Sequence, residues 1–194
     1  MNKIKLLLLT AIISILSISA FAGDDNEERK GVRSGWQISN FYNNGDSFGD
    51  NLSSFYIGVY GEKDLIPMLR LGLSLEYNST GATTTLATIE SKYVRHSIAI
   101  PIYLKVKLGP VFALGGVAPS FGVANKLKVA DESVDLTDDQ KTSVFDTPLF
   151  LGLGVEISIV SIEARYNWGV LDLDKTDNAS FTQQYFQIGV AVSF

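Results

Sequence analysis

The sequence predicts an all-β fold, an eight-stranded antiparallel up-and-down transmembrane β-barrel that follows a cleaved N-terminal signal peptide. Three observations lead to this prediction. Apolar and polar residues alternate with a period of two in one segment after another, which is the pattern of strands with two different faces. The connections between these segments are alternately short and long. The aromatic residues of the apolar face fall near the ends of the segments.

The chain begins with the pattern of a secretory signal peptide. Lys3 and Lys5 precede an apolar run over residues 6–18, and the small-residue site Ala20-Phe21-Ala22 follows. The run is shorter than the roughly 20 residues that a membrane-spanning helix needs. We therefore expect residues 1–22 to direct export and to be removed by cleavage after Ala22.

The mature chain is expected to be one domain without covalent cross-links. Residues 1–22 hold two of the 16 basic residues and none of the 21 acids, which leaves 14 against 21 and a net charge of −7. This acidic balance argues against nucleic acid as a partner, because phosphate binding needs a basic face. The chain has no Cys, so neither disulfides nor a lipidated cysteine support it. We expect a periplasmic N-terminal segment at 23–33 and a barrel domain at 34–194.

The alternation is clearest over residues 69–77. One face carries Leu and Tyr side chains, while the other carries Arg70 and Glu76 between Gly and Ser. One face therefore suits lipid and the other suits water. Four further segments alternate clearly and three alternate more weakly: 98–108, 149–158, 160–170 and 185–194, then 35–42, 55–60 and 111–121. Together these segments make eight strands.

The lengths of the connections favour an outer-membrane barrel with both termini in the periplasm. Long polar connections are expected at 43–51, 79–90, 124–147 and 172–182. Short connections are expected near 61–66, at 109–110 and at 159–160. Short turns at one end and long loops at the other are typical of barrels in the outer membrane.

The aromatic residues predict two girdles on the lipid-facing side. The predicted strand directions place Trp36 and Phe194 at the periplasmic end of the barrel. They place five others at the outer end: Tyr42, Phe55, Tyr77, Trp168 and Phe186. A soluble lipocalin-like barrel is the alternative, but its apolar face points inward and it does not explain the girdles.

The polar face predicts a charged lumen. A barrel of eight strands is only wide enough for its own side chains to fill it. Seven charged residues fall on this face: Arg70, Glu76, Arg95, Lys105, Glu156, Glu163 and Arg165. We expect Glu76 and Arg95 to lie near the top on neighbouring strands, and Glu156 to lie almost opposite Glu163 with a cation between them. This predicts a plugged barrel held by an internal ion-pair network, with a structural role.

Several motifs resemble the PorT-type outer-membrane β-barrel family. The segment Ile98-Ala-Ile-Pro-Ile-Tyr-Leu-Lys105 is followed by Leu108-Gly-Pro-Val111 and the pair Gly115-Gly116. The later segment Glu163-Ala-Arg-Tyr-Asn-Trp-Gly-Val170 is also similar to that family, and the resemblance extends from Gly35 to Phe194. It implies an outer-membrane location, and the terminal Phe194 is similar to the signal read by the barrel-assembly machinery. Some PorT-like proteins assist protein secretion.

The residues that could carry chemistry do not form a recognisable catalytic or metal site. His96 is the only histidine and faces lipid by parity, and Ile98 occupies the place of Ser in the His-x-Ser element that resembles lipid A deacylases. The acidic connection 124–147 lacks a calcium-loop pattern and is expected to be a solvated surface loop. Pro101 removes one ladder hydrogen bond from its strand, and we expect a bulge or a lumen water to accommodate it.

These observations predict a non-enzymatic barrel with a structural or interaction role in the cell envelope. An accessory protein of a secretion or assembly system, by analogy with PorT, is the alternative, and a lipid A modifying enzyme is a disfavoured third. No catalytic residue, cofactor or metal ligand is predicted. We expect a monomer surrounded by outer-membrane lipids and lipopolysaccharide, inserted by the barrel-assembly machinery, with outer loops that can contact a protein partner.

Overall fold

The computed structural model describes residues 28–43, 46–86, 89–129, 132–136, 145–170 and 181–194. The predicted signal peptide and its cleavage site after Ala22 lie outside these residues. Within them, no helix has the length and apolar character to cross a membrane.

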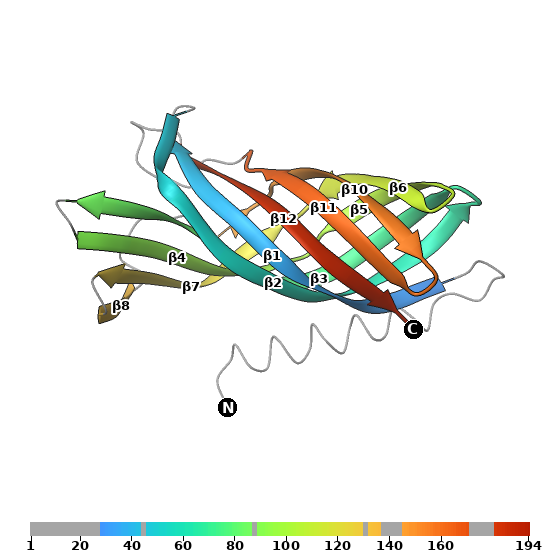
Figure 1. The fold of residues 1–194 in the computed structure, drawn as a ribbon, viewed down its shortest axis with the longest axis horizontal. Coiled ribbons are helices and arrows are strands. Elements are labelled where there is room, and N and C mark those ends of the chain that lie inside the picture. Colours follow the sequence, from blue (N-terminus) through green and yellow to red (C-terminus); the bar gives the residue numbers. More distant parts are fainter. Residues whose placement is uncertain (1–27, 44–45, 87–88, 130–131, 137–144, 171–180) are drawn as a thin grey trace.

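The described residues form twelve β-strands that pair antiparallel throughout, and their arrangement is shown in Figure 1. The strands are β1 (Glu28–Asn43), β2 (Asp46–Ile66), β3 (Leu69–Leu86), β4 (Ile89–Ala99), β5 (Ile102–Leu108), β6 (Val111–Val117), β7 (Ser120–Val129), β8 (Glu132–Leu136), β9 (Phe145–Asp146), β10 (Leu149–Ile157), β11 (Val160–Trp168) and β12 (Phe181–Ser193). In three places consecutive strands are pieces of a single barrel strand: β4 and β5, β6 and β7, and β8, β9 and β10, of which β8 and β9 both pair with β7. The barrel therefore has eight strands, and β1 closes it by pairing with both β2 and β12.

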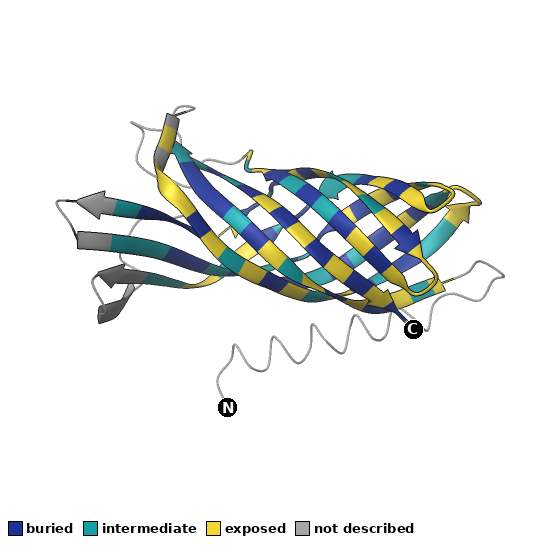
Figure 2. Ribbon diagram, viewed as in Figure 1, coloured by how far each residue is buried: buried dark blue, intermediate teal, exposed yellow. Residues whose placement is uncertain are grey.

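The barrel carries its apolar side chains outside and its polar side chains inside. Buried and exposed residues alternate along the strands, as Figure 2 shows. On β10, Leu149, Leu151 and Leu153 are exposed, while Phe150 and Glu156 are buried. A soluble protein rarely exposes such a continuous apolar surface. The predicted lipid-facing and lumen-facing parity is confirmed, and the soluble lipocalin-like alternative does not fit.

Three prolines interrupt three neighbouring barrel strands. Pro101 lies between β4 and β5, so the structure has a strand break at this position instead of the predicted bulge. Its carbonyl accepts a hydrogen bond from the Ser74 backbone N–H at 2.9 Å. Pro119 and Pro148, at the next two breaks, each accept a backbone hydrogen bond in the same way. Each missing proline N–H therefore coincides with a break in the ladder, while the proline carbonyls stay bonded.

Three of the four predicted long polar loops are largely strands where the structure describes them, and the fourth, at 172–182, lies mostly outside the described residues. In the ladders, Asn43 pairs with Asp46, Leu86 with Ile89, and Val129 with Glu132, so the connections at 43–51 and 79–90 and the described part of 124–147 are hairpin extensions. Beyond the lipid both faces of a hairpin meet water, so the apolar alternation disappears although strand pairing continues. The run Thr83-Thr84-Thr85 shows this, because Thr is polar yet favours strands.

The barrel also begins earlier than predicted. Residues 28–33, assigned from the sequence to a periplasmic segment, belong to β1, where Arg33 pairs with Ala191 and Gly58. The turn after β10 consists of Ser158 and Ile159, one residue before the predicted position. Both shifts change which charged residues meet inside the barrel.

Candidate functional site

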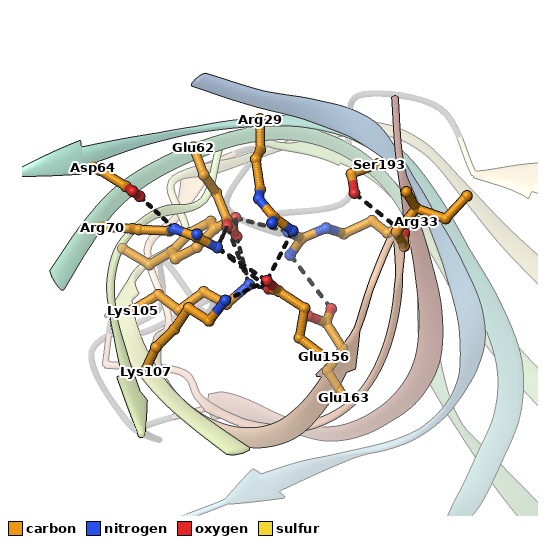
Figure 3. A network of polar contacts seen from close by, with 12 residues as sticks. Arg29, Arg33, Glu62, Asp64, Arg70, Lys105, Lys107, Glu156, Glu163 and Ser193 are labelled. Atoms are coloured by element: carbon orange, nitrogen blue, oxygen red, sulfur yellow. Dashed lines mark hydrogen bonds and ion pairs between the residues drawn. The ribbon is translucent and has the colours of Figure 1, made fainter. Parts of the chain in front are cut away.

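The lower lumen, at the end with the short turns, is organised around the carboxylate of Glu156 on β10. Arg29 and Arg70 approach its Oε1 at 2.8 and 3.2 Å. Lys107 Nζ lies 2.6 Å from Oε1, and Lys105 Nζ lies 2.7 Å from Oε2. Four cations from three other strands thus converge on one buried carboxylate, as Figure 3 shows from the end of the barrel.

Two acids of β2 complete this lower layer. Glu62 pairs with Lys105 at 3.1 Å and with Arg70 at 3.7 Å. Asp64 accepts a hydrogen bond from Arg70 Nε. Because Arg70 and Lys105 each contact Glu62 and Glu156, the layer is a connected network and not a set of separate pairs.

The middle layer contains two arginines and two glutamates, all with buried side chains. Arg165 on β11 donates to Glu76 on β3 through both terminal nitrogens, at 2.9 and 3.2 Å. Arg33 lies 3.4 Å from Glu163 and 3.6 Å from Glu76, and Arg165 Nε lies 3.5 Å from Glu163. The two positive and two negative charges balance, as buried charges require.

Tyr103 links the two layers. Its hydroxyl accepts a hydrogen bond from Arg33 at 2.7 Å and donates one to Glu62 at 2.9 Å. The Arg33 guanidinium also lies over the rings of Tyr60 and Tyr103, at 4.5 and 5.3 Å from their centroids. Arg33 is therefore held by two carboxylates, the Tyr103 hydroxyl and two aromatic rings.

Side-chain amides form a third layer above the charges. The Gln187 amide donates to Gln37 at 2.9 Å and to Asn78 at 3.2 Å. Asn167 donates to Gln187 at 3.1 Å, and Gln37 donates to the Ser79 carbonyl at 2.6 Å. These neutral groups tie β1, β3, β11 and β12 together across the lumen.

Aromatic rings fill the remaining volume. Tyr103, Phe112 and Phe150 pack with Leu114 and Ala118 in one buried cluster. Rings also lie directly over inward-facing glycines: a Cβ added at Gly72 would come within 2.2 Å of the Tyr103 ring, and one at Gly154 within 2.3 Å of Phe112. The lumen is therefore packed with side chains, as expected for eight strands.

Six of the seven predicted lumen charges lie in this network, and Arg95 lies elsewhere. Arg95 lies on β4, which pairs with the β3 strand of Glu76 as expected, but its register partner is Thr80 and it interacts electrostatically with Asp146. Glu156 and Glu163 are not opposite each other, because the turn at Ser158-Ile159 pairs Glu156 with Ser161 and Glu163 with Gly154. The predicted placement of Glu156 opposite Glu163 was wrong.

Five network residues are absent from the predicted lumen charges: Arg29, Arg33, Glu62, Asp64 and Lys107. The alternation over residues 98–108 nevertheless places Lys107 on the polar face. Arg29 and Arg33 precede the predicted start of the barrel, and Glu62 and Asp64 follow the predicted end of the second strand. The period of two, continued backwards from Trp36, places Arg33 on the lumen face. The same continuation from Tyr60 places Glu62 and Asp64 there.

The outer surface carries one aromatic belt near the long-hairpin end of the barrel. We define it by aromatic residues that are register partners on adjacent strands or whose rings contact each other: Trp36, Phe55, Tyr77, Phe121, Phe145, Tyr166, Trp168 and Phe186. Trp36 is the register partner of Phe55 and so belongs to this belt, not to the periplasmic end as predicted. The error arose because β1 begins eight residues before Trp36.

The other predicted girdle residues lie outside this belt. Tyr42 is six positions beyond Trp36 along β1, in the extension that pairs with Thr182. Phe194 is 85% exposed at the opposite end, where its backbone N–H donates to the Lys30 carbonyl at 2.9 Å. Of the seven predicted girdle residues, Phe194 alone lies at the lower end, so the described residues do not form the predicted second girdle.

His96 lies on the outer surface beside the belt. Its Nδ1 is 2.7 Å from the Tyr77 hydroxyl, and the two rings stack with centroids 5.9 Å apart. In the part of the chain that the structure describes, no group of three or more His, Cys, Asp or Glu side chains could hold a metal ion.

Comparisons with known proteins agree with the fold. The family model described as "Outer membrane protein beta-barrel domain" matches residues 8–194. Among solved structures, Neisserial surface protein A (NspA) is similar with a TM-score of 0.59 and 12% identity, over 85% of this chain and 97% of that chain. Ail, the attachment invasion locus protein of Yersinia pestis, is similar with a TM-score of 0.52 and 14% identity, over 87% and 99%. No curated protein matches the chain. Because the family model covers almost all of its length, this chain belongs to the outer membrane protein beta-barrel domain family.

Proposed function

We propose that this protein is a non-enzymatic scaffold of the outer membrane, a closed barrel that holds β-hairpins outside the membrane for contact with a partner. One observation carries the proposal: the strands continue far beyond the aromatic belt while the lumen beneath is filled. On β3 the ladder runs from Tyr77 in the belt to Leu86 at the hairpin end. Nine further residues correspond to about 30 Å of paired strand.

The filled lumen favours contact over transport. A pore needs hydrated space, whereas here ion pairs, amides and rings meet across the barrel. An enzymatic role lacks support as well, because His96 is bonded to Tyr77 on the outer surface. NspA is described as a surface protein and Ail as an attachment invasion locus protein, which agrees with a role at the cell surface.

The proposal includes the route by which the protein reaches the membrane. Export would follow cleavage after Ala22, and the barrel-assembly machinery would recognise the terminal Phe194. The mature monomer would then lie among outer-membrane lipids and lipopolysaccharide, with the aromatic belt at the outer interface. A PorT-like accessory role in secretion is the second candidate, and it stays a prediction based on the resemblance of residues 35–194.

Site-specific photo-crosslinking in living cells tests this function. A photoreactive amino acid is placed at Asn51, which is exposed on β2 beyond the belt, or at Leu153, which faces lipid on β10. We expect a protein adduct from Asn51 and none from the Leu153 control. Failure to obtain an adduct from Asn51 contradicts the interaction role. A stoichiometric adduct with a component of a secretion system would favour the accessory role in secretion over the scaffold role.

A further inference from the structure

We propose that the lower lumen is an oxyanion-binding site whose resident anion is the chain's own Glu156 carboxylate. This inference is independent of the partner proposed above, because it concerns the end of the barrel with the short turns. When Glu156 is removed, the site should take another carboxylate or a phosphate, either from solution or from a phospholipid headgroup.

The geometry around Glu156 is that of a bound anion. Its two oxygens have nitrogen atoms from Arg29, Arg70, Lys105 and Lys107 between 2.6 and 3.2 Å away. Charge-assisted contacts from arginine and lysine at such distances are how proteins hold carboxylate and phosphate groups. The four cations are therefore already arranged around an oxyanion.

The charge balance shows that this layer depends on that anion. Its four cations face three carboxylates, those of Glu62, Asp64 and Glu156. Without Glu156, four cations would face two carboxylates. The middle layer is balanced and has no carboxylate to share. Buried cations without a counter-charge are unfavourable, so another oxyanion would be drawn into the vacated place.

The layer can also be reached from the periplasmic side. The side chains of Arg29 and Lys107 are 28% and 22% exposed, while those of Arg70 and Lys105 are buried behind them. Arg29 also donates to the Ser158 carbonyl in the β10–β11 turn at 3.4 Å. In contrast, Arg33 and Arg165 in the middle layer are buried completely. An anion from outside can therefore reach the lower layer and not the middle one.

Substitution of Glu156 by Gln tests the proposal, with Glu163→Gln as the matched control. Both changes remove a buried carboxylate from the network and keep the shape of its side chain. The thermal midpoint of each refolded protein is measured in detergent micelles, at constant ionic strength, with inorganic phosphate or with chloride. A parallel series replaces phosphate by micelles that contain short-chain phosphatidylglycerol.

We expect inorganic phosphate, phosphatidylglycerol or both to raise the midpoint of Glu156→Gln by several degrees in a saturable manner. The wild type and Glu163→Gln should not respond, because the first has its own anion and the second has no access. The series that responds identifies the source of the oxyanion. An unresponsive Glu156→Gln protein, or an equal response of all three proteins, overturns the proposal.

If Glu156→Gln does not fold in chloride, the refolding yield is measured in place of the thermal midpoint. Phosphate in the refolding buffer should then rescue it. The double variant Lys105→Gln, Glu156→Gln leaves three cations against two carboxylates, the same excess as in the wild type, and should refold without phosphate. If Glu156→Gln folds equally poorly in phosphate and in chloride, the proposal is wrong.

Discussion

Arg165 and Glu76 connect two strands that are not neighbours in the barrel wall. Arg165 lies on β11, between β10 and β12, whereas Glu76 lies on β3, between β2 and the β4–β5 strand. Their two hydrogen bonds, at 2.9 and 3.2 Å, therefore cross the lumen. Such a bidentate pair fixes both the distance and the orientation of opposite walls.

This cross-lumen pair predicts a strong and non-additive loss of stability. Arg165→Met leaves the buried Glu76 with Arg33 at 3.6 Å and the Ser74 hydroxyl at 3.2 Å, and Glu76→Met leaves Arg165 with Glu163 at 3.5 Å. Each single change should lower the free energy of unfolding by about 3 to 5 kcal/mol, because it leaves a buried charge poorly compensated. Urea titration of protein refolded into lipid vesicles measures the loss.

The double variant Glu76→Met, Arg165→Met is the control for this coupling. It removes both charges, so its loss should be clearly smaller than the sum of the two single losses. The exposed pair of Lys30 and Glu28 provides a second reference, since Lys30→Met should cost no more than about 1 kcal/mol. Additive losses at positions 76 and 165 would show that the pair does not act as a unit.

The packing of the lumen predicts that Gly72 cannot carry a side chain. A Cβ at this position would lie 2.2 Å from two carbon atoms of the Tyr103 ring. Gly72→Ala must displace that ring, and with it the hydroxyl that joins Arg33 to Glu62. We expect a loss of about 1 to 3 kcal/mol in the free energy of unfolding.

Gly61→Ala is the matched control in the neighbouring strand. The nearest atom to a Cβ at Gly61 is the Arg29 carbonyl oxygen at 4.0 Å, so the substitution should be tolerated. The two variants are compared by the same urea titration. Equal stability of both would mean that Tyr103 does not rest against Gly72.

We expect arginine substitutions at the lipid-facing positions of β10 to cost more free energy of insertion the deeper they lie in the membrane. Leu153 and Ile157 are on the same face of this strand and are 66% and 69% exposed. Ile157 is at the short β10–β11 turn, and Leu153 lies about 13 Å further along the strand. Leu153→Arg should impair insertion by about 2 to 4 kcal/mol, whereas Ile157→Arg near the interface should cost about 0 to 1 kcal/mol. Folding equilibria in lipid vesicles measure both, and equal costs would contradict a lipid-facing position for Leu153.

The parity of the strands could be predicted from the sequence because lipid and lumen impose opposite demands on successive residues. Along β10 this rule places every residue from Leu149 to Ile157 on its observed side. This alternation no longer identifies a strand outside the lipid, because there both faces of the strand meet water. The hairpin that contains Thr83 was therefore predicted as a loop although it is paired strand.

The height of a residue along the barrel axis and its ion-pair partner across the lumen could not be predicted in the same way. The height of Trp36 depends on where β1 begins and on its register with Phe55, and neither is contained in the alternation. The partner of Glu76 was sought on a neighbouring strand, at Arg95, while the structure supplies Arg165 from the opposite wall. Such contacts depend on the closed shape of the barrel, which local sequence patterns do not specify.

Current recording in a planar lipid bilayer tests most directly whether the lumen is sealed by its charge network. The wild-type protein should insert without sustained conductance. The variant with Glu156→Ala and Glu163→Ala removes carboxylates from the lower and middle layers, so its cations repel one another and openings should appear. Silence of the wild type together with conductance of the double variant is the predicted result, and sustained porin-like conductance of the wild-type protein would contradict a sealed lumen.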